Sequence, residues 1–452
     1  MSSPSSGFVV EPAKNVAVHG EYDVVVIGGG PSGIAAAASA ARNGARTLLI
    51  ESYGFLGGMG TAGGVTNLAG LYGIRNGVMQ QLVHGVVDEL MERIEWLGGL
   101  NQPQDGMQGR IRVRSYDISA YKCAADALLL EHGVELLFHA QARAVSLADG
   151  RMDSLLVETK SGRKAIRARA FIDCTGDGDV AAQAGVPFEV GDGQGSGLFP
   201  TTMFRVGNVD AASALAAIGD FKAINDYMRQ AQERHPGRYV FPRDGAIVRP
   251  QLNPTEWRVN VTQIKNAQGK AMNGVDAVEL SQGEIEGRRQ IASYFEFLRA
   301  EVPGFANSYI IEIAPQVGIR ETRRICGLYQ LSRDDIENSA RFEDTVGINA
   351  WPMEMHQDGR VDWVFPKSAQ RAYNDLPWRM LVPLGISNLL VAGRCASATH
   401  EGQSAARASG GCFVMGQAAG TAAAMFKDTP FAEISVPALQ QRLIADGAYI
   451  ER

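Results

Sequence analysis

One short segment gathers the charged side chains that a substrate anion would need. Residues 318–324 read Gly-Ile-Arg-Glu-Thr-Arg-Arg. If this segment is a strand, side-chain alternation places Arg320, Thr322 and Arg324 on one face. Glu321 then lies on the other face. A guanidinium is a planar fork of hydrogen-bond donors, so the arginine face could hold a carboxylate or polarise a carbonyl. A structural network of arginine and glutamate at a domain junction is an equally good interpretation.

A second candidate pairs a carboxylate with an imidazole. Glu354 and His356 are two residues apart in the string Trp-Pro-Met-Glu-Met-His, so an extended backbone places them on the same side. A carboxylate can orient the imidazole and raise its basicity, which predicts a general base that works near neutral pH. The alternative is a solvated histidine in a loop.

The strongest single candidate for catalysis is His400. It lies next to Glu401, just ahead of a run of small, helix-forming residues. As a general base it would remove a proton from the substrate. Arg407 and Tyr373 are weaker candidates, for which packing or a cofactor contact is the better interpretation.

The elements that would position these residues begin with a dinucleotide-binding fingerprint. Residues 22–33 read Tyr-Asp-Val-Val-Val-Ile-Gly-Gly-Gly-Pro-Ser-Gly. The β-branched run predicts a buried parallel strand, and Gly28, Gly30 and Gly33 follow at the G-x-G-x-x-G spacing. These glycines permit a tight turn, the approach of a pyrophosphate and close packing of a helix, in that order. A second apolar strand ends at Glu51, whose carboxylate can accept hydrogen bonds from a ribose hydroxyl.

A glycine-rich loop directly follows this acid and favours a flavin. Six glycines occur from Gly54 to Gly64. Backbone so rich in glycine suits close approach to a large flat ligand and its phosphates. The apolar Leu56 and Met59 within the loop argue against a solvated linker.

The C-terminal region supports the same ligand. Residues 388–392 are expected to form a buried strand that ends in Gly393 and Arg394, and a long helix of small residues is expected from about Ser404 to Phe426. The N-terminus of such a helix carries partial positive charge and free amide donors. That end is suited to stabilise negative charge on the pyrimidine side of a reduced flavin. A helix that only packs against its neighbours is the alternative.

These segments together resemble one family. The string at 388–401, the later run Gly-Gln-Ala-Ala-Gly-Thr-Ala-Ala-Ala and the motifs at 173–179, 318–324 and 351–356 carry the resemblance. They are similar to the FAD-dependent oxidoreductase family of glutathione-reductase-type (two-dinucleotide-binding-domain-like) flavoproteins. The resemblance covers about residues 22–427. It implies a Rossmann-type fold that binds FAD, and it is nearly silent about the substrate.

The motifs and the resemblance also predict which residues contact FAD. A strand at 170–173 should return to the sheet and end in a turn close to the cofactor. Asp177 or Asp179 could bond the cofactor there, although a helix N-cap suits either residue equally well. The predicted contacts are Gly28, Gly30, Pro31, Ser32, Gly33, Glu51, Ser52, Gly57, Gly58, Met59, Gly60, Thr61, Ala142, Thr175, Gly176, Asp177, Gly393, Arg394 and Gly411.

The expected fold class is α/β, with a Rossmann-type FAD-binding domain and an inserted α+β substrate domain. A parallel sheet and a β-meander over 142–168 would make up the FAD-binding domain. No second G-x-G-x-x-G follows a strand, so no separate nicotinamide domain is expected. The expected parts are a flexible N-terminal arm (1–20), the FAD-binding domain in two pieces (21–187 and 376–430), a substrate or cap domain (188–375) and a C-terminal helix (431–452).

Composition excludes several other classes. The chain has 452 residues, 45% of them hydrophobic, which is enough for two domains. Its net charge of −6 offers no basic footprint for nucleic acid. The five cysteines form neither C-x-x-C nor C-x₄-C, which argues against a disulfide reductase, and the histidines show no metal-ligand spacing. No apolar run suggests a membrane span, and the N-terminal residues do not read as a secretory signal. We expect a cytoplasmic enzyme, for which a homo-oligomer would be ordinary.

The expected reaction is transfer of a hydride from a small organic substrate to flavin N5. His400 or His356 would remove a proton, and Arg320 would hold the anionic or carbonyl end of the substrate. Oxygen, a quinone or another carrier is the expected electron acceptor. One alternative is a non-redox flavoenzyme, a hydratase or isomerase that uses FAD as an acid–base or electronic element. The other is a binding module in which FAD is a structural or sensing ligand.

Overall fold

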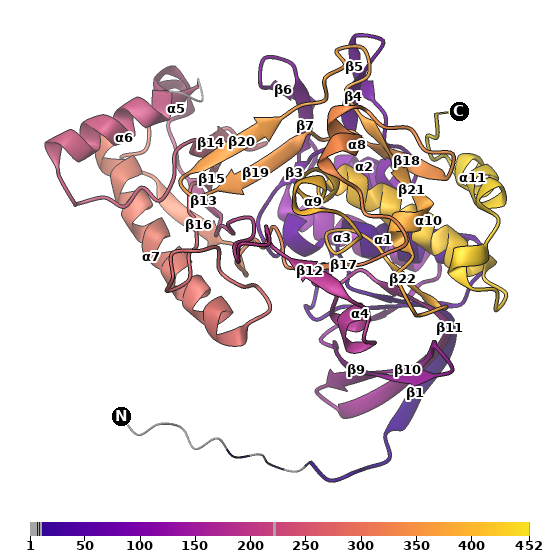
Figure 1. Ribbon diagram of the computed structural model, residues 1–452. Coiled ribbons are helices and arrows are strands. Elements are labelled where there is room, and N and C mark those ends of the chain that lie inside the picture. The colour runs from indigo at the N-terminus through magenta and orange to yellow at the C-terminus, as the bar shows by residue number, and fades with distance from the viewer. Residues whose placement is uncertain (1–6, 8, 10, 220–222, 452) are drawn as a thin grey trace.

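A seven-stranded sheet forms the centre of the protein, of which the computed structural model describes residues 7, 9, 11–219 and 223–451. Its first strand pairs in parallel with two neighbours, and the parallel part extends by one further strand on either side (Figure 1). The strand order is β8 (Glu135–Leu137), β2 (Thr47–Ile50), β1 (Ala17–Ile27), β11 (Gly162–Asp173), β10 (Arg151–Thr159) and β9 (Gln141–Ala148), and β22 (Leu389–Val391) also pairs with β11.

β11 joins the parallel sheet to the meander. It pairs antiparallel with β10 along its first half and parallel with β1 and β22 toward its end. The meander strand and the returning strand, which the sequence separated near residue 168, are therefore one strand. They are continuous because β1 stays paired with it from Lys164 to Asp173. β1 begins at Ala17, so residues 17–20 of the expected arm belong to a strand, and residues 1–6, 8 and 10 lie outside the described residues.

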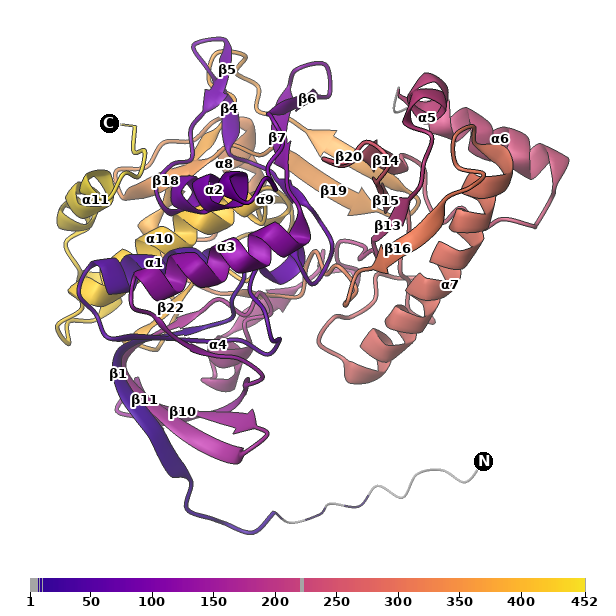
Figure 2. The same cartoon turned by 180° about the vertical axis from the view of Figure 1, so that it is seen from behind.

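Two helices of small residues pack closely beside the parallel strands. They are α1 (Pro31–Arg42) and α10 (Ser409–Met425). A Cβ on Gly416 would lie 2.0 Å from the carbonyl oxygen of Ser32, a separation that real Cβ atoms do not reach. Glycine is therefore required for this helix spacing. Figure 2 shows α3 (Ile118–Glu131) and α2 (Val86–Trp96) lying beside this pair.

The single helix expected over 404–426 is two helices. α9 (His400–Ala406) ends early, and Ala408 adopts an extended backbone with φ −59° and ψ 150°. α10 begins directly afterwards, where the amide of Gly410 donates to the carbonyl of Ala69 at 2.8 Å. A long-range contact sets this break, so a local run of helix-forming residues does not reveal it.

A second sheet with its own core lies to one side of the central sheet (Figure 1). It is antiparallel, and Trp257, Phe297 and Phe305 are fully buried beneath it. This agrees with the α+β insertion that the sequence predicts. Residues 220–222 of this region lie outside the described residues. The elements are β14 (Ile247–Pro250), β15 (Trp257–Asn260), β13 (Phe204–Gly207), β16 (Tyr309–Ile313), α5 (Ala211–Ile218), α6 (Ala223–Arg234) and α7 (Ala277–Glu301).

Short strand pairs and helices join the two sheets. No helix among the described residues has the length and apolar character needed to cross a membrane.

The expected C-terminal helix is confined to α11 (Val436–Ala445). The other elements are η1 (Gly58–Gly60), β3 (Asn67–Leu68), β4 (Tyr72–Arg75), β5 (Val78–Gln81), β6 (Gln104–Gly106), β7 (Ile111–Ser115), α4 (Asp179–Gln183), β12 (Phe188–Val190), β17 (Arg323–Ile325), α8 (Arg333–Glu337), β18 (Thr345–Asn349), β19 (Met353–Gln357), β20 (Arg360–Val364), β21 (Asn374–Pro377), η2 (Trp378–Leu381) and η3 (Phe431–Glu433).

Candidate active site and cofactor-binding loops

The first glycine-rich loop has a backbone that only glycine allows. Gly28 has a φ of +99°, and a Cβ there would lie 2.4 Å from the carbonyl oxygen of Cys174. A Cβ on Gly33 would lie 1.8 Å from the carbonyl oxygen of Gly28. The helix that follows begins at Pro31, and neither a capping side chain nor an acidic residue occupies its first turn. An uncapped helix N-terminus beside a loop without side chains favours a phosphate.

Glu51 lies over this loop and is 7% exposed. One carboxylate oxygen accepts a hydrogen bond from the amide of Gly29 at 2.7 Å. The other accepts from the Ser52 hydroxyl at 2.8 Å and the Tyr53 amide at 2.9 Å. A carboxylate offers about four acceptor sites, so one remains for a ribose hydroxyl. The acid is therefore held beside the phosphate-binding loop with acceptor capacity to spare.

The second glycine-rich loop lies directly against the first. Gly57 and Gly58 have left-handed backbones, with φ of +110° and +51°. The amide of Gly57 donates to the carbonyl of Gly29 at 2.8 Å. A Cβ on Gly58 would lie 2.8 Å from the Cα of Gly30. Two backbones thus meet without side chains between them, which suits a ligand that must approach both closely.

The remaining predicted FAD contacts occupy neighbouring positions, with one exception. Ala142 lies in β9 opposite Val157, in the meander. Its contact with FAD stays a prediction. The others are Ser32 in the first turn of α1, Met59 and Gly60 in η1, Thr61 directly after η1, Gly393, whose Cβ would lie 2.5 Å from the Ser32 hydroxyl oxygen, and Gly411 in the first turn of α10.

The turn after β11 is organised by an acid that was not among the predicted site residues. Asp173 is fully buried and accepts hydrogen bonds from the amides of Val180 and Ala181, each at 2.9 Å. It also accepts from the amide and hydroxyl of Thr175. Burial outweighs these bonds and raises the pKa of Asp173 to about 6. Asp173 thus satisfies the amides of Val180 and Ala181, and the Thr175 hydroxyl accepts from the Asp179 amide at 3.1 Å, so neither Asp177 nor Asp179 caps α4.

Asp177 and Arg394, both predicted to bind FAD, bond to each other. The Arg394 Nη2 atom lies 2.7 Å from Asp177 Oδ1, and Thr322 donates to the same oxygen at 2.7 Å. Arg394 also donates to the carbonyls of Gly176 at 2.8 Å and Ile319 at 2.6 Å. These bonds fasten the turn after β11 to the segment that carries the arginines. A direct contact of either residue with FAD stays a prediction.

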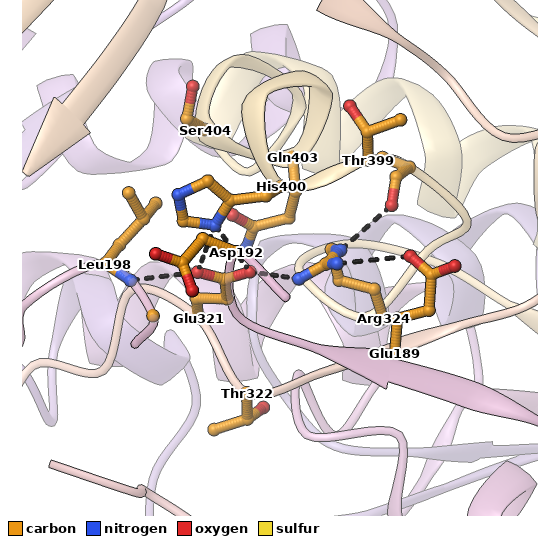
Figure 3. A network of polar contacts seen from close by, with 12 residues as sticks. Glu189, Asp192, Leu198, Glu321, Thr322, Arg324, Thr399, His400, Gln403 and Ser404 are labelled. Atoms are coloured by element: carbon orange, nitrogen blue, oxygen red, sulfur yellow. Dashed lines mark hydrogen bonds and ion pairs between the residues drawn. The ribbon is translucent and has the colours of Figure 1, made fainter. Parts of the chain in front are cut away.

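His400 is held by a buried carboxylate, as Figure 3 shows. Its Nδ1 atom lies 2.8 and 3.0 Å from the two oxygens of Glu321, whose side chain is 1% exposed. The Leu198 amide donates to Glu321 at 2.8 Å, and Arg324 forms an ion pair with it. Among the described residues, nothing hydrogen-bonds to His400 Nε2. The partner is therefore Glu321 from a distant segment, and not the adjacent Glu401.

The alternation expected in residues 318–324 is wrong. Glu321 and Arg324 were assigned to opposite faces, but they form an ion pair. The reason is that the strand begins only at Arg323, so the residues before it need not alternate. Arg323 instead donates to Asp179 at 2.8 Å.

The Glu354–His356 pair forms as expected, but its electrostatics are the reverse of the expectation. Both lie in β19, with His356 Nε2 at 3.1 Å from Glu354 Oε1. Burial and the nearby Arg320 lower the pKa of His356 to about 3, although Glu354 opposes this. His356 is therefore neutral and a poor proton acceptor near neutral pH. This environment argues against a general base at His356, whose catalytic role stays a prediction.

The three predicted catalytic residues converge on one segment. The amide of Leu198 bonds to the carboxylate that holds His400. The next residue, Phe199, accepts a hydrogen bond from Arg320, and its amide donates to the carbonyl of His356 at 3.1 Å. Sequence alone placed these residues in three separate segments. Tyr373, the weaker candidate, lies elsewhere and donates to Glu451 at 3.0 Å.

Comparison with known proteins decides the family. The model of the FAD-dependent oxidoreductase family matches residues 23–443. The chain belongs to this family. No curated protein matches it. Among solved structures, it is similar to p-nitrophenol 4-monooxygenase PnpA from Pseudomonas putida, with 13% identity over 94% of this chain and 84% of that chain and a TM-score of 0.48. It is also similar to a geranylgeranyl bacteriochlorophyll reductase-like protein from Thermoplasma acidophilum, with 13% identity over 94% and 82% of the two chains and a TM-score of 0.45.

Membership confirms that this is an FAD-dependent enzyme, and the site fits that cofactor. Besides the two loops and Glu51, the structure contains a buried acceptor that no protein atom satisfies. Gln403 is 2% exposed, its amide nitrogen donates to the carbonyl of Arg320 at 2.8 Å, and its Oε1 has no partner among the described residues. Buried acceptors are normally paired, so this oxygen is suited to accept a hydrogen bond from a bound molecule. No cluster of possible metal ligands occurs among the residues that the structure describes.

Sequence reasoning missed Glu321 and Gln403 as functional residues. Glu321 was named only as the far side of an arginine strand. The Glu-x-x-Arg spacing with Arg324 was the available signal, since residues three apart meet wherever the backbone turns. Gln403 follows His400 by three positions, which is the spacing of one helical turn. Gln403 carried no signal in the sequence, because the start of the helix at His400 was not known.

Proposed function

We propose that this FAD-dependent oxidoreductase oxidises a small organic substrate with His400 as the proton acceptor. The observation that carries the proposal is the buried pair of His400 and Glu321. A carboxylate only accepts hydrogen bonds, so the Nδ1 atom facing both oxygens of Glu321 must carry the hydrogen. The Nε2 atom then presents its lone pair, which is the atom a general base needs.

The surroundings of Glu321 support this role. Arg324 and the amide of Leu198 hold the buried carboxylate in place. When a proton reaches Nε2, the new imidazolium faces a carboxylate whose position is already fixed. Its charge is stabilised without rearrangement of the surrounding protein. Proton removal by His400 should therefore be faster than proton removal by a solvated histidine.

Other elements of the chain would hold the cofactor. Glu51, the start of α1 and the loop from Gly57 to Gly60 are the groups that would bind the dinucleotide. Bound FAD supplies the acceptor for the two electrons that the substrate loses. The chain contributes orientation and the proton acceptor. Oxygen, a quinone or another carrier as final acceptor, a cytoplasmic location and assembly into homo-oligomers are further parts of the proposal.

The test is anaerobic visible absorption of the holoenzyme with a panel of alcohols, amines and organic acids. Bleaching of the oxidised-flavin bands by one class supports the proposal. His400→Gln keeps a hydrogen bond to Glu321 but cannot accept the proton, so the bleaching rate should fall by about 100-fold or more. The control is His235→Gln. This histidine also lies near a glutamate, 3.4 Å from Glu301, but its side chain is 41% exposed and it belongs to the part of the chain that carries the second sheet.

Three outcomes are distinguishable. Equal slowing by His400→Gln and His235→Gln contradicts the assignment of the base. Loss of flavin from the His400 variant contradicts it as well, because the residue would then hold the cofactor. If no compound bleaches the flavin while dithionite does, the redox proposal fails and the non-redox flavoenzyme takes its place.

A further inference from the structure

The charges beside the His400 pair are unbalanced. Two of the arginines there have their own acid, since Arg394 pairs with Asp177 and Arg324 with Glu321. Arg320 and Arg407, in contrast, form no close ion pair among the described residues, and Arg407 lies 3.8 Å from Glu354. Arg243, a further buried cation close to Arg320, also forms no ion pair with an acid among the described residues. Buried positive charge therefore exceeds the charge of Glu354 here.

Most hydrogen-bond donors of these two arginines have no acceptor among the described residues. A guanidinium has five N–H donors. Arg320 is 8% exposed, and one donor of its guanidinium goes to the carbonyl of Phe199. Arg407 donates to the carbonyl of Glu354 at 3.3 Å and lies 3.8 Å from the carboxylate. Its Nε atom is buried and has no partner among the described residues.

The contrast with a nearby arginine shows that this is not the usual state of a buried arginine here. Arg243 is 5% exposed and donates to the carbonyls of Thr262, Asp244, Gly245 and Asn260. Such bonds compensate a buried cation in place of an acid. Arg320 and Arg407 lack this compensation. Burial and Arg407 accordingly push the pKa of Arg320 well below its usual value.

The arginines with these donors belong to the segments that also carry the proposed base and its carboxylate. His400 begins α9, and Arg407 lies just past its end. Gln403 lies between them, and its amide nitrogen bonds to the carbonyl of Arg320 at 2.8 Å. Arg320 directly precedes Glu321, which holds His400. A small molecule in contact with Arg320 and Arg407 would therefore lie no farther from His400 than about the length of α9.

We infer that the substrate carries a carboxylate group and that Arg320 and Arg407 bind it. This inference rests on the proposed function, because it names the substrate class of that site. The planar fork of a guanidinium matches a carboxylate in two parallel hydrogen bonds. A carboxylate also brings negative charge to a place where buried cations outnumber acids.

The test uses the holoenzyme with propionate and benzoate as probes, and propionamide and benzamide as neutral controls of the same shape. Binding is followed by the change in the visible flavin spectrum. The acids should bind saturably, whereas the amides should not. Arg407→Gln should weaken binding of the acids by about tenfold or more, since a hydrogen bond to a charged group is lost. Arg407→Lys keeps the charge but not the fork, and should weaken binding less.

A variant that is expected to tighten binding of the probes separates a binding role from a structural one. Glu354→Gln removes the acid that competes for both arginines, so the probes should bind more tightly. A site that serves only stability would be damaged by both changes. The matched control is Arg360→Gln, because this arginine pairs with Asp362 but is 68% exposed, and its loss should leave the dissociation constant unchanged.

Acids and amides that bind alike, or acids that cause no spectral change, would overturn the inference. So would an Arg407→Gln variant that loses FAD, since that arginine would then hold the cofactor. Failure of the proposed function gives a different pattern, in which acids bind through Arg407 but no compound reduces the flavin. Reduction by a neutral substrate that depends on His400 and not on Arg407 supports the function and rejects the carboxylate.

Discussion

Replacing Glu321 by glutamine should slow flavin reduction far more than it changes substrate binding. The amide has nearly the same shape, but its nitrogen can donate to His400 Nδ1. The hydrogen of the imidazole then moves to Nε2, the atom that must accept the substrate proton. General-base catalysis contributes about 10²- to 10⁴-fold, and we expect a loss in this range in the reduction rate at saturating substrate.

The substitution also has a structural cost, which must be separated from the catalytic one. The side chain of Arg324 is 4% exposed and would lose its buried carboxylate, keeping only the half-exposed Glu189 at 3.2 Å and the carbonyl of Ala398 at 3.0 Å. Breaking a buried pair costs about 3–5 kcal/mol. The two remaining partners favour the lower end of that range. Because domains are stable by about 5–15 kcal/mol, the variant should fold with a lowered melting temperature.

The assay is stopped-flow flavin reduction with whichever substrate bleaches the flavin, together with thermal unfolding and FAD content. Glu321→Gln/Arg324→Gln removes the unpaired cation as well as the acid. This double variant should recover much of the melting temperature but none of the reduction rate. His400→Gln/Glu321→Gln should be no slower than His400→Gln alone, since the acid acts only through the histidine.

Two results would refute this reasoning. In the first, the Glu321→Gln/Arg324→Gln variant recovers both stability and rate, which would make the acid purely structural. In the second, the losses of the single variants multiply in the His400→Gln/Glu321→Gln variant. Independent effects of that kind would mean that Glu321 acts on the reaction by a route other than His400.

Three further predictions test the packing, the cofactor loop and the buried histidine. Gly416→Val should lower the free energy of unfolding by about 1–3 kcal/mol, because a Cβ at this position would be 2.0 Å from the Ser32 carbonyl oxygen. Thermal unfolding measures this loss, and the control Ala424→Val on the same helix should cost less. Gly58→Ala should weaken FAD binding by about tenfold in a flavin-release assay, since the new Cβ would be 2.8 Å from the Cα of Gly30 and the backbone is left-handed; unchanged release would mean that the loops do not bind FAD together. His356 has a folded pKa of about 3 against 6.5 when unfolded, so the unfolded state binds more protons and stability falls as pH falls below 6.5. His356→Gln should remove about 2 kcal/mol of the loss between pH 6.5 and about 4.5 in denaturant unfolding, and an unchanged pH dependence would show that this histidine titrates normally.

The cofactor half of the site was predictable because its signals are local. The strand, the glycine spacing and the acid at Glu51 follow one another along the chain, and each has one structural meaning. A glycine such as Gly28 shows in the sequence itself where the backbone can adopt a conformation that only glycine permits. The break before α10 was not predictable, because it depends on a bond between Gly410 and Ala69, which are far apart in the chain.

The catalytic half depends on pairs that no local pattern specifies. His400 was found as a candidate, but the sequence assigned it no partner, because it shows only neighbours such as Glu401. The true partner, Glu321, comes from a segment whose expected strand does not form at that residue. Its position is set by Leu198, from a third segment. Residue type therefore indicated the proposed base, whereas only the fold could identify the carboxylate that orients it.

The two histidines of the site show why residue types alone do not assign roles. Each lies about 3 Å from a glutamate oxygen, so a list of contacts treats them alike. They differ in the cations that share each acid. Glu321 forms its ion pair with Arg324, and a proton on His400 would face this carboxylate. Glu354 lies near both Arg320 and Arg407, so a proton on His356 would add to cations that are already close. The first environment is suited to receive a proton and the second to receive an anion, as the two proposals require.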